Sequence, residues 1–113
     1  MWRVLFLGDE VVNEFEKLPP KIKSKMLKII DLLKEYGNGV VGEPYTKSLG
    51  GGLFEIRAKG MEGIGRGIYC YEIDKTILIL NVFVKKTQKT PKKEIELALK
   101  RLKEYKDGKI SWV

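Results

Sequence analysis

The side chains best placed for chemistry lie on three strands that the sequence predicts at about residues 53–58, 65–73 and 77–84. Alternation along these strands and just beyond them puts charged side chains on one common face: Glu55, Arg57, Arg66 and Lys85. The same surface can present aromatic rings: Tyr45, Phe83 and either Tyr69 or Tyr71. Basic side chains interleaved with aromatic rings suit single-stranded RNA, because they neutralise its phosphates and stack on its bases. We therefore expect a solvent-facing, basic sheet surface that binds RNA.

A run of lysines extends this surface beyond the last strand. Residues 85–93 contain no acidic side chain but five basic ones: Lys85, Lys86, Lys89, Lys92 and Lys93. Residues 47–113 hold fifteen basic and eight acidic side chains, whereas residues 1–46 hold seven of each, so the whole excess of +7 lies in the later segment. This asymmetry favours a polyanionic ligand over the alternative, a lysine-rich surface that is merely solvated.

Composition excludes several other kinds of site. The 113 residues include no His and one cysteine, so an intramolecular disulfide, a Cys/His zinc site and a Ser-His or Cys-His catalytic pair are impossible. Cys70 is expected to be a small buried apolar residue rather than a nucleophile. No metal and no cofactor are predicted. No apolar run reaches the ~20 residues that a membrane span needs, and no signal peptide is visible, which indicates a small cytoplasmic protein.

The first half of the chain predicts elements that would support this surface. Residues 2–7 suit a strand that ends at Gly8, and Asp9 offers an N-cap for a short helix. After a Leu-Pro-Pro interruption, a second helix carries one apolar stripe: Ile22, Met26, Ile29, Leu33 and Tyr36. Residues 37–52 contain six glycines and are predicted to form a long loop.

A last helix is predicted after the lysine-rich run. Thr90 would supply its capping hydroxyl, and Pro91 would begin its first turn. Its apolar face follows helical spacing: Ile95, Ala98, Leu99 and Leu102. Residues 110–113 could add a short strand. The predicted fold is a single α+β domain over residues 1–113 in the order β-α-α-β-β-β-α, with a small antiparallel sheet, an N-terminal helix hairpin and a C-terminal helix.

Several motifs in the second half follow one another in a recognisable order. Lys47 to Arg57 reads KSLGGGLFEIR, residues 66–69 read RGIY, residues 79–86 read ILNVFVKK, and residues 89–95 read KTPKKEI. These segments resemble the RelE/HigB toxin superfamily, and more narrowly its phage-derived HigB-like branch, whose members often read K.L..GLWELR, R..Y and F.KK..KTP..EI..A. The likeness runs from Lys47 to about Arg101, about half of the chain.

This resemblance implies a RelE-like fold and the toxin of a type II toxin–antitoxin system. Such a toxin is an endoribonuclease that cuts mRNA, commonly in the ribosomal A site, and its expected partner is a cognate helix-turn-helix antitoxin. Because this chain has no His, one Cys and no clustered carboxylates, its cleavage is expected to be independent of metal. In the family, basic residues on a concave sheet surface grip the RNA, and the matching positions here are Lys47, Arg57, Arg66, Lys85 and Lys86. Several relatives use a His as acid or base, and this chain has none.

The reaction is possible without His, because RNA carries its own nucleophile, the 2′-hydroxyl. Arg57 and Arg66 could bind the phosphate oxygens in bidentate fashion, where charge grows in the transition state. A lysine crowded by other cations, or else Glu55, could act as the base, and Lys85 or Lys86 could protonate the leaving 5′ oxygen. The sequence leaves the division of these roles open. Other side chains are assigned to binding RNA: Lys47, Phe83, Lys89, Lys92 and Lys93.

Two other functions fit the same residues. A non-catalytic member of the fold would be a basic module that binds nucleic acid, the ribosome or a partner protein. Another branch of the superfamily poisons gyrase, although the Lys89-Thr90-Pro91 segment favours the RNA-cutting branch. A neighbouring gene for a small helix-turn-helix protein would favour a toxin over a generic binding module.

Overall fold

A computed structural model describes residues 1–37, 39, 41–72 and 74–109, which form three helices and one five-stranded sheet. The elements in chain order are β1 (Arg3–Phe6), α1 (Gly8–Glu16), α2 (Pro20–Tyr36), β2 (Thr46–Gly50), β3 (Leu53–Gly60), β4 (Gly63–Glu72), β5 (Thr76–Lys85) and α3 (Lys92–Lys106). The predicted α+β class, with its helix pair first and a helix last, is confirmed. The strand considered for residues 110–113 lies outside the described residues.

The strand order in the sheet is β1-β5-β4-β3-β2. The neighbours β2 to β5 pair antiparallel, as predicted for the last three strands, but β1 pairs parallel to β5. The sheet is therefore mixed rather than purely antiparallel. The short turn predicted between the last two strands is confirmed, since Glu72 pairs with Thr76 across it and Asp74 and Lys75 both have positive φ.

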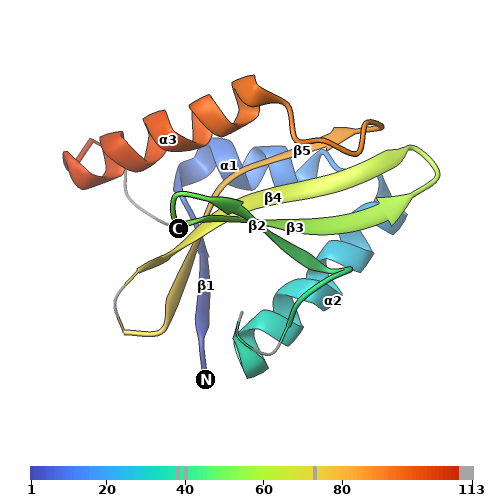
Figure 1. Ribbon diagram of the computed structural model, residues 1–113, viewed down its shortest axis with the longest axis horizontal. Helices are drawn as coiled ribbons and strands as arrows, with labels where there is room; N and C mark the ends of the chain where they lie inside the picture. The colour runs from blue at the N-terminus through green and yellow to red at the C-terminus, as the bar shows by residue number, and fades with distance from the viewer. Residues whose placement is uncertain (38, 40, 73, 110–113) are drawn as a thin grey trace.

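Helices α2 and α3 cover opposite faces of the sheet (Figure 1). Alternation along β4 shows which residues face which helix, because a Cβ placed on Gly65 would collide with Ile22 of α2. Gly65 therefore faces α2, and its neighbour Arg66 points to the other face. Helix α3 packs against β5 and β4 on that second face, and α1 lies against β5 and β1.

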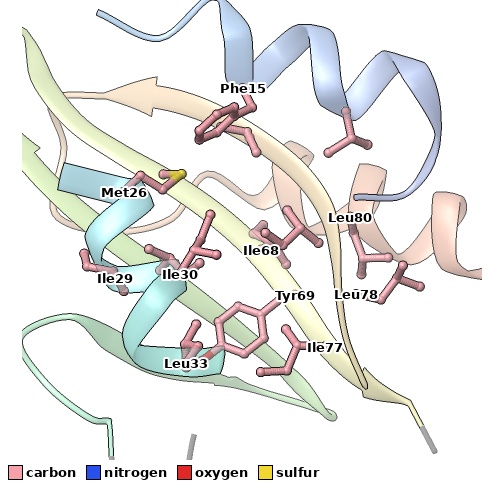
Figure 2. Close-up of a cluster of buried hydrophobic side chains, with 14 of the residues drawn as sticks. Phe15, Met26, Ile29, Ile30, Leu33, Ile68, Tyr69, Ile77, Leu78 and Leu80 are labelled. Carbon is pink, nitrogen blue, oxygen red and sulfur yellow. The ribbon is translucent and has the colours of Figure 1, made fainter. Parts of the chain in front are cut away.

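The main core lies between α2 and the sheet. Ile22, Met26, Ile29 and Leu33 are buried, which confirms most of the predicted stripe, but Tyr36 at its end is 50% exposed. Figure 2 shows Met26, Ile29 and Leu33 of α2 against the central strands, with the ring of Tyr69 extending from β4 toward Leu33. Packing against α2 thus uses one face of β3 and β4, and the predicted charged residues lie on the other face, together with apolar residues such as Ile68.

The predicted loop over residues 37–52 contains a strand, β2, that the sequence does not reveal. Its one large apolar residue is Leu49, and the strand exists because residues 46–48 pair with residues 54–56 of β3. The glycine run 50–52 has positive φ throughout, so it forms the turn between the two strands. Pairing across this turn, rather than apolar alternation, stabilises β2.

Both predicted N-caps are wrong. Helix α1 begins at Gly8, so Asp9 lies inside its first turn, and the helix has no side-chain cap. Helix α3 has Pro91 at its N-cap position and no side-chain cap either. The Thr90 hydroxyl donates to Glu55 on β3 instead. On α3, Ala98 is buried as predicted, but Leu99 is 49% exposed.

Candidate active site

The pairing of the central strands brings the predicted site residues together on the α3 side of the sheet, in two rows of directly paired residues. The first row crosses β3, β4 and β5 and consists of Arg57, Arg66 and Phe83. The second row crosses β2, β3, β4 and β5 and consists of Lys47, Glu55, Ile68 and Asn81. The sequence-based prediction that these strands share one charged face is therefore confirmed.

The expectation that this face is open to solvent is wrong at its centre. Glu55 and Arg66 are fully buried, and 12% of the Arg57 side chain is exposed. The cause is the connection between β5 and α3, residues 86–91, which turns back over the sheet before α3 begins (Figure 1). We call this segment the β5–α3 connection. Charged side chains are rarely buried without partners, so their contacts define the site.

Both arginines donate to main-chain oxygens of the β5–α3 connection. Nη2 of Arg66 donates to the carbonyl of Thr87, and Nη2 of Arg57 donates to the carbonyl of Gln88. Nη1 of Arg66 also lies 3.5 Å from the hydroxyl oxygen of Thr90. The two guanidinium groups are thus held side by side by one short stretch of backbone.

Glu55 supplies the negative charge beside these cations. Its Oε1 lies 3.2 Å from Nε of Arg57, and its Oε2 accepts a hydrogen bond from the Thr90 hydroxyl. Burial lowers the pKa of Arg66, and the charge of Arg57 adds to this effect, while the charge of Glu55 opposes it. A guanidinium still keeps its proton at neutral pH. Two arginines and one carboxylate therefore leave a net charge of +1 largely shielded from water, which suits an anionic ligand.

The predicted lysines remain exposed around this centre. They lie on β2, at the end of β5, in the β5–α3 connection and in the first turn of α3: Lys47, Lys85, Lys86, Lys89, Lys92 and Lys93. Phe83, in the row of the two arginines, is partly buried. These side chains can reach an RNA backbone from outside, whereas Glu55 and Arg66 cannot.

The other proposed aromatic rings do not belong to this face. Tyr69 is fully buried in the core beneath α2, and Tyr71 packs against the rings of Trp2 and Phe54. Tyr45 is exposed, but it lines a hollow of about 460 Å³ along α2, on the other side of the sheet. Of the rings proposed from the sequence, Phe83 alone lies in the rows that hold Arg66 and Glu55.

Sequence reasoning missed two residues of the site. The sequence predicts a helix cap at Thr90, whereas the structure shows that its hydroxyl links Glu55 and Arg66. Asn81 lies in the second row, is 1% exposed, and donates to the side-chain and main-chain oxygens of Glu94 on α3. The available signal was the position of both residues inside the NVFVKK and KTP motifs. Nothing local in the sequence indicates which partners they contact.

Arg101, the last residue of the family-like motifs, joins α3 to α1. Its two terminal nitrogens contact both carboxylate oxygens of Glu14 at 3.1 and 2.7 Å, and one of them also donates to the carbonyl of Leu80 at 2.9 Å. Burial opposes the charge of Arg101, but the hydrogen bond and charge of Glu14 outweigh it, with a further contribution from Glu10, and raise its pKa. This residue fixes α3 on the sheet and lies outside the charged rows.

Three further predictions concern chemistry away from the arginines. Cys70 is buried, and burial, with the charge of Glu72, raises the pKa of its thiol to about 11, so the prediction of an unreactive cysteine agrees with its surroundings. Within the described ranges, no cluster of three or more His, Cys, Asp or Glu side chains is arranged to hold a metal ion. Among the described helices, none has the length and apolar character to span a membrane.

Comparison with known proteins places the chain in a family. A family model described as "Phage derived protein Gp49-like (DUF891)" matches residues 13–103. The chain belongs to the Gp49-like family. A search among curated proteins gave no match for this Gp49-like protein. Its fold is similar to that of a chain in "Crystal structure of archaeal RelE-RelB complex from Pyrococcus horikoshii OT3", with a TM-score of 0.52 and 27% identity, over 78% of this chain and 98% of that chain. These matches confirm the resemblance to the RelE superfamily and the RelE-like fold.

Proposed function

We propose that this Gp49-like protein is the toxin of a type II toxin–antitoxin pair and cuts mRNA as an endoribonuclease, in the cytoplasm and within the ribosomal A site. The observation that carries the proposal is the pairing of Arg57 and Arg66 beside Glu55 on one sheet face. The exposed lysines around this centre and the similarity to a chain of a RelE-RelB complex support it.

The proposed reaction forms a bond between the RNA 2′ oxygen and phosphorus and breaks the bond from phosphorus to the 5′ oxygen. The products are a 2′,3′-cyclic phosphate and a free 5′-hydroxyl end. Once the β5–α3 connection no longer covers them, Arg57 and Arg66 bind the non-bridging oxygens, whose negative charge grows in the transition state. Strands hold both guanidinium groups, and strands fix geometry better than loops do.

Proton transfer in this scheme needs one base and one acid. We assign the base to Glu55, because it is the carboxylate in contact with Arg57 and can accept the 2′-hydroxyl proton. The acid is Lys85 or Lys86, which are exposed at the end of β5 and beside it and can protonate the leaving 5′ oxygen. Lys47, Phe83, Lys89, Lys92 and Lys93 bind the RNA outside the reacting phosphate.

The test is primer extension on mRNA after induced expression of the wild-type protein and of Arg57→Ala. Loss of a preorganised donor to the transition state should lower cleavage about 10²–10³-fold. Arg57 is the better first target, because Arg66 is fully buried and its replacement also changes packing. Lys75→Ala, in the distant β4–β5 turn, is the matched control and should cleave normally. Absence of new 5′ ends with the wild-type protein, on ribosomes and on free RNA, would refute the proposal.

A second candidate is a non-catalytic module that binds nucleic acid or the ribosome. The burial of Glu55 and Arg66 beneath the β5–α3 connection favours it, since neither can touch a ligand while covered. This candidate predicts RNA binding that depends on Lys89, Lys92 and Lys93, with no cleavage under any condition.

A further inference from the structure

The β5–α3 connection uses the same arginine atoms that a phosphate group would use. The carbonyl oxygens of Thr87 and Gln88 accept hydrogen bonds from Arg66 and Arg57. Guanidinium groups bind phosphate through these terminal N–H groups. A phosphate that binds through these two Nη2 groups therefore has to displace the backbone of the connection.

The covered arrangement leaves polar atoms poorly satisfied. Nε of Arg66 is buried and has no hydrogen-bond partner in the described part of the chain, and the same holds for Oδ1 of Asn81. Nε of Arg57 lies 3.2 Å from Glu55 Oε1 but outside hydrogen-bond geometry. A phosphate brings several charged acceptor oxygens, and charge-assisted hydrogen bonds are about twice as strong as neutral ones. Replacing two carbonyls by a phosphate would therefore give the arginines better partners.

One side chain fixes the connection over the site. Thr87, Gln88 and Lys89 are exposed, whereas Thr90 is 8% exposed and its hydroxyl lies between Glu55 and Arg66. A hydrogen bond to a carboxylate is stronger than a bond between neutral groups. Thr90 is thus the main side-chain attachment of the β5–α3 connection to the charged rows.

We propose that the β5–α3 connection closes the arginine site in the free protein, that Thr90 is the positioning residue that holds it closed, and that an RNA phosphate displaces the carbonyls of Thr87 and Gln88. The identity of the displacing anion rests on the proposed function, and the closure itself does not. Lys86 and Lys89 lie on the connection and face solvent, so RNA can bind them before the site opens. Opening is then favoured because the arginines contact phosphate only in the open state.

The experiment measures the modification rate of each arginine by phenylglyoxal, read by mass spectrometry of peptides. In the free wild-type protein, Arg66 should react slowly compared with the exposed Arg3. Thr90→Val removes the hydroxyl without a large change in shape and should raise the Arg66 rate about tenfold or more. Thr90→Ser should restore the slow rate. Thr87→Val, whose hydroxyl contacts the Lys89 carbonyl within the connection, is the matched control and should leave the rate unchanged.

Arg101 separates opening of the connection from unfolding. It is also buried, but its partners are Glu14, Glu10 and the Leu80 carbonyl, so opening of the connection should leave it protected. If Thr90→Val exposes both Arg66 and Arg101, the variant has unfolded. A second variant, with two glycines inserted between Gln88 and Lys89, then lengthens the connection without changing a buried side chain. In that variant, opening of the connection alone should raise the modification rate of Arg66 and leave that of Arg101 unchanged. Rapid modification of Arg66 in the free wild-type protein, or no increase in the opened variants, would overturn the proposal.

A second arm uses a 2′-O-methyl oligonucleotide, which lacks the attacking hydroxyl and cannot be cut. Thr90→Val should bind it about tenfold more tightly, because the RNA no longer competes with a fixed connection. If the Arg66 rates support closure but no variant binds or cuts RNA, the proposed function fails and the closure stands. If the wild type cuts RNA while Arg66 is already reactive, the closure fails and the proposed function stands.

Discussion

The two kinds of cation in this protein occupy different surroundings. Arg57 and Arg66 are on strands and largely buried, where a planar guanidinium can satisfy several acceptors at once. The lysines of the β5–α3 connection and the start of α3 are exposed point charges on the outside. Under the proposed function, we expect Arg57 and Arg66 to act on the reacting phosphate, and Lys89, Lys92 and Lys93 to bind the RNA backbone.

Single alanine substitutions should separate these two roles. Replacement of Lys89, Lys92 or Lys93 should weaken RNA binding modestly and lower the slope of log K against log salt by about 0.7 each, while turnover of bound RNA stays nearly intact. Arg57→Ala should lower turnover about 10²–10³-fold with a small change in binding. Single-turnover assays on programmed ribosomes at several salt concentrations measure both effects. Lys21→Ala on α2 is the control for a general change in charge.

An Arg57→Ala variant that changes only the binding constant would contradict the catalytic assignment. Arg57 would then be a positioning residue for RNA. An equal salt effect from Lys21→Ala would show that net charge, and not the site, drives binding.

Cys70 should react as a buried thiol. Its pKa is raised from 9.0 to about 11, so at pH 8 the native protein carries about 100-fold less thiolate than an unfolded chain. Iodoacetamide labelling at pH 8 should therefore be at least this much slower in buffer than in urea. The raised pKa stabilises the fold below pH 9, and this contribution is lost as the pH rises through 11. Equal labelling rates in the two solutions would contradict the assignment.

At the scale of elements, the site depends on where α3 begins and how it is fixed. The contact of Arg101 with Glu14 joins α3 to α1, and the Leu80 carbonyl joins the same side chain to β5. The β5–α3 connection thus joins two elements, β5 and α3, that are also linked by the Arg101 side chain. We infer that this ion pair positions the connection as well as the helix.

Glu14→Ala should destabilise the fold, because it leaves the buried Arg101 cation with the Leu80 carbonyl and the exposed Glu10, whose Oε1 lies 3.3 Å from Nη2 of Arg101. Removing one partner of a largely buried pair lowers the free energy of unfolding by about 3 kcal/mol. The exposed pair of Lys103 and Asp107, at 3.1 Å, offers a control, and Asp107→Ala should cost less than about 1 kcal/mol. Urea unfolding of both variants measures the difference. If both variants lose a similarly small free energy of unfolding, α3 is held on the sheet by apolar packing alone.

Much of this arrangement could be predicted from the sequence, because the signals are local. Alternation along β3, β4 and β5 is enough to place Glu55, Arg57 and Arg66 on one face, and the register confirms it. Strand β2 gives no such signal, since it depends on pairing with β3. The burial of Arg66 is equally hidden, because its partners lie 21 and 24 residues further along the chain. A charged residue in an alternating strand indicates the solvent side only where no other segment returns to cover it.

At the scale of the whole molecule, one apolar cluster connects all three helices with the sheet. It includes Val11 of α1, Leu33 of α2, Ile68 of β4 and Ala98 of α3. A chain of this size with a single core should unfold in one cooperative step. Far-UV and near-UV circular dichroism should therefore show coincident thermal transitions and a spectrum with both helix and sheet. Two separated transitions would contradict the prediction of a single domain.

The distribution of charge over the molecule bears on its partner. Residues 47–113 carry an excess of seven positive charges, and much of it is exposed on α3, the β5–α3 connection and the end of β5. Oppositely charged surfaces associate faster than neutral ones, and this rate falls with ionic strength. An antitoxin that covers this side therefore needs an acidic segment, or an apolar one that displaces α3.

Co-expression with the neighbouring gene tests this partner. We expect the product to relieve growth arrest and to form a stable complex, as in the related RelE-RelB structure. The association rate should fall as salt increases, and Lys92→Ala with Lys93→Ala should lower it several-fold with little effect on dissociation. Lys21→Ala with Lys28→Ala on α2 removes the same charge from the other side of the sheet and is the matched control.

If the two double variants associate equally slowly, the total charge of the protein rather than the surface around α3 selects the partner. If no neighbouring product binds, the antitoxin proposal fails, while RNA cleavage can still be tested directly.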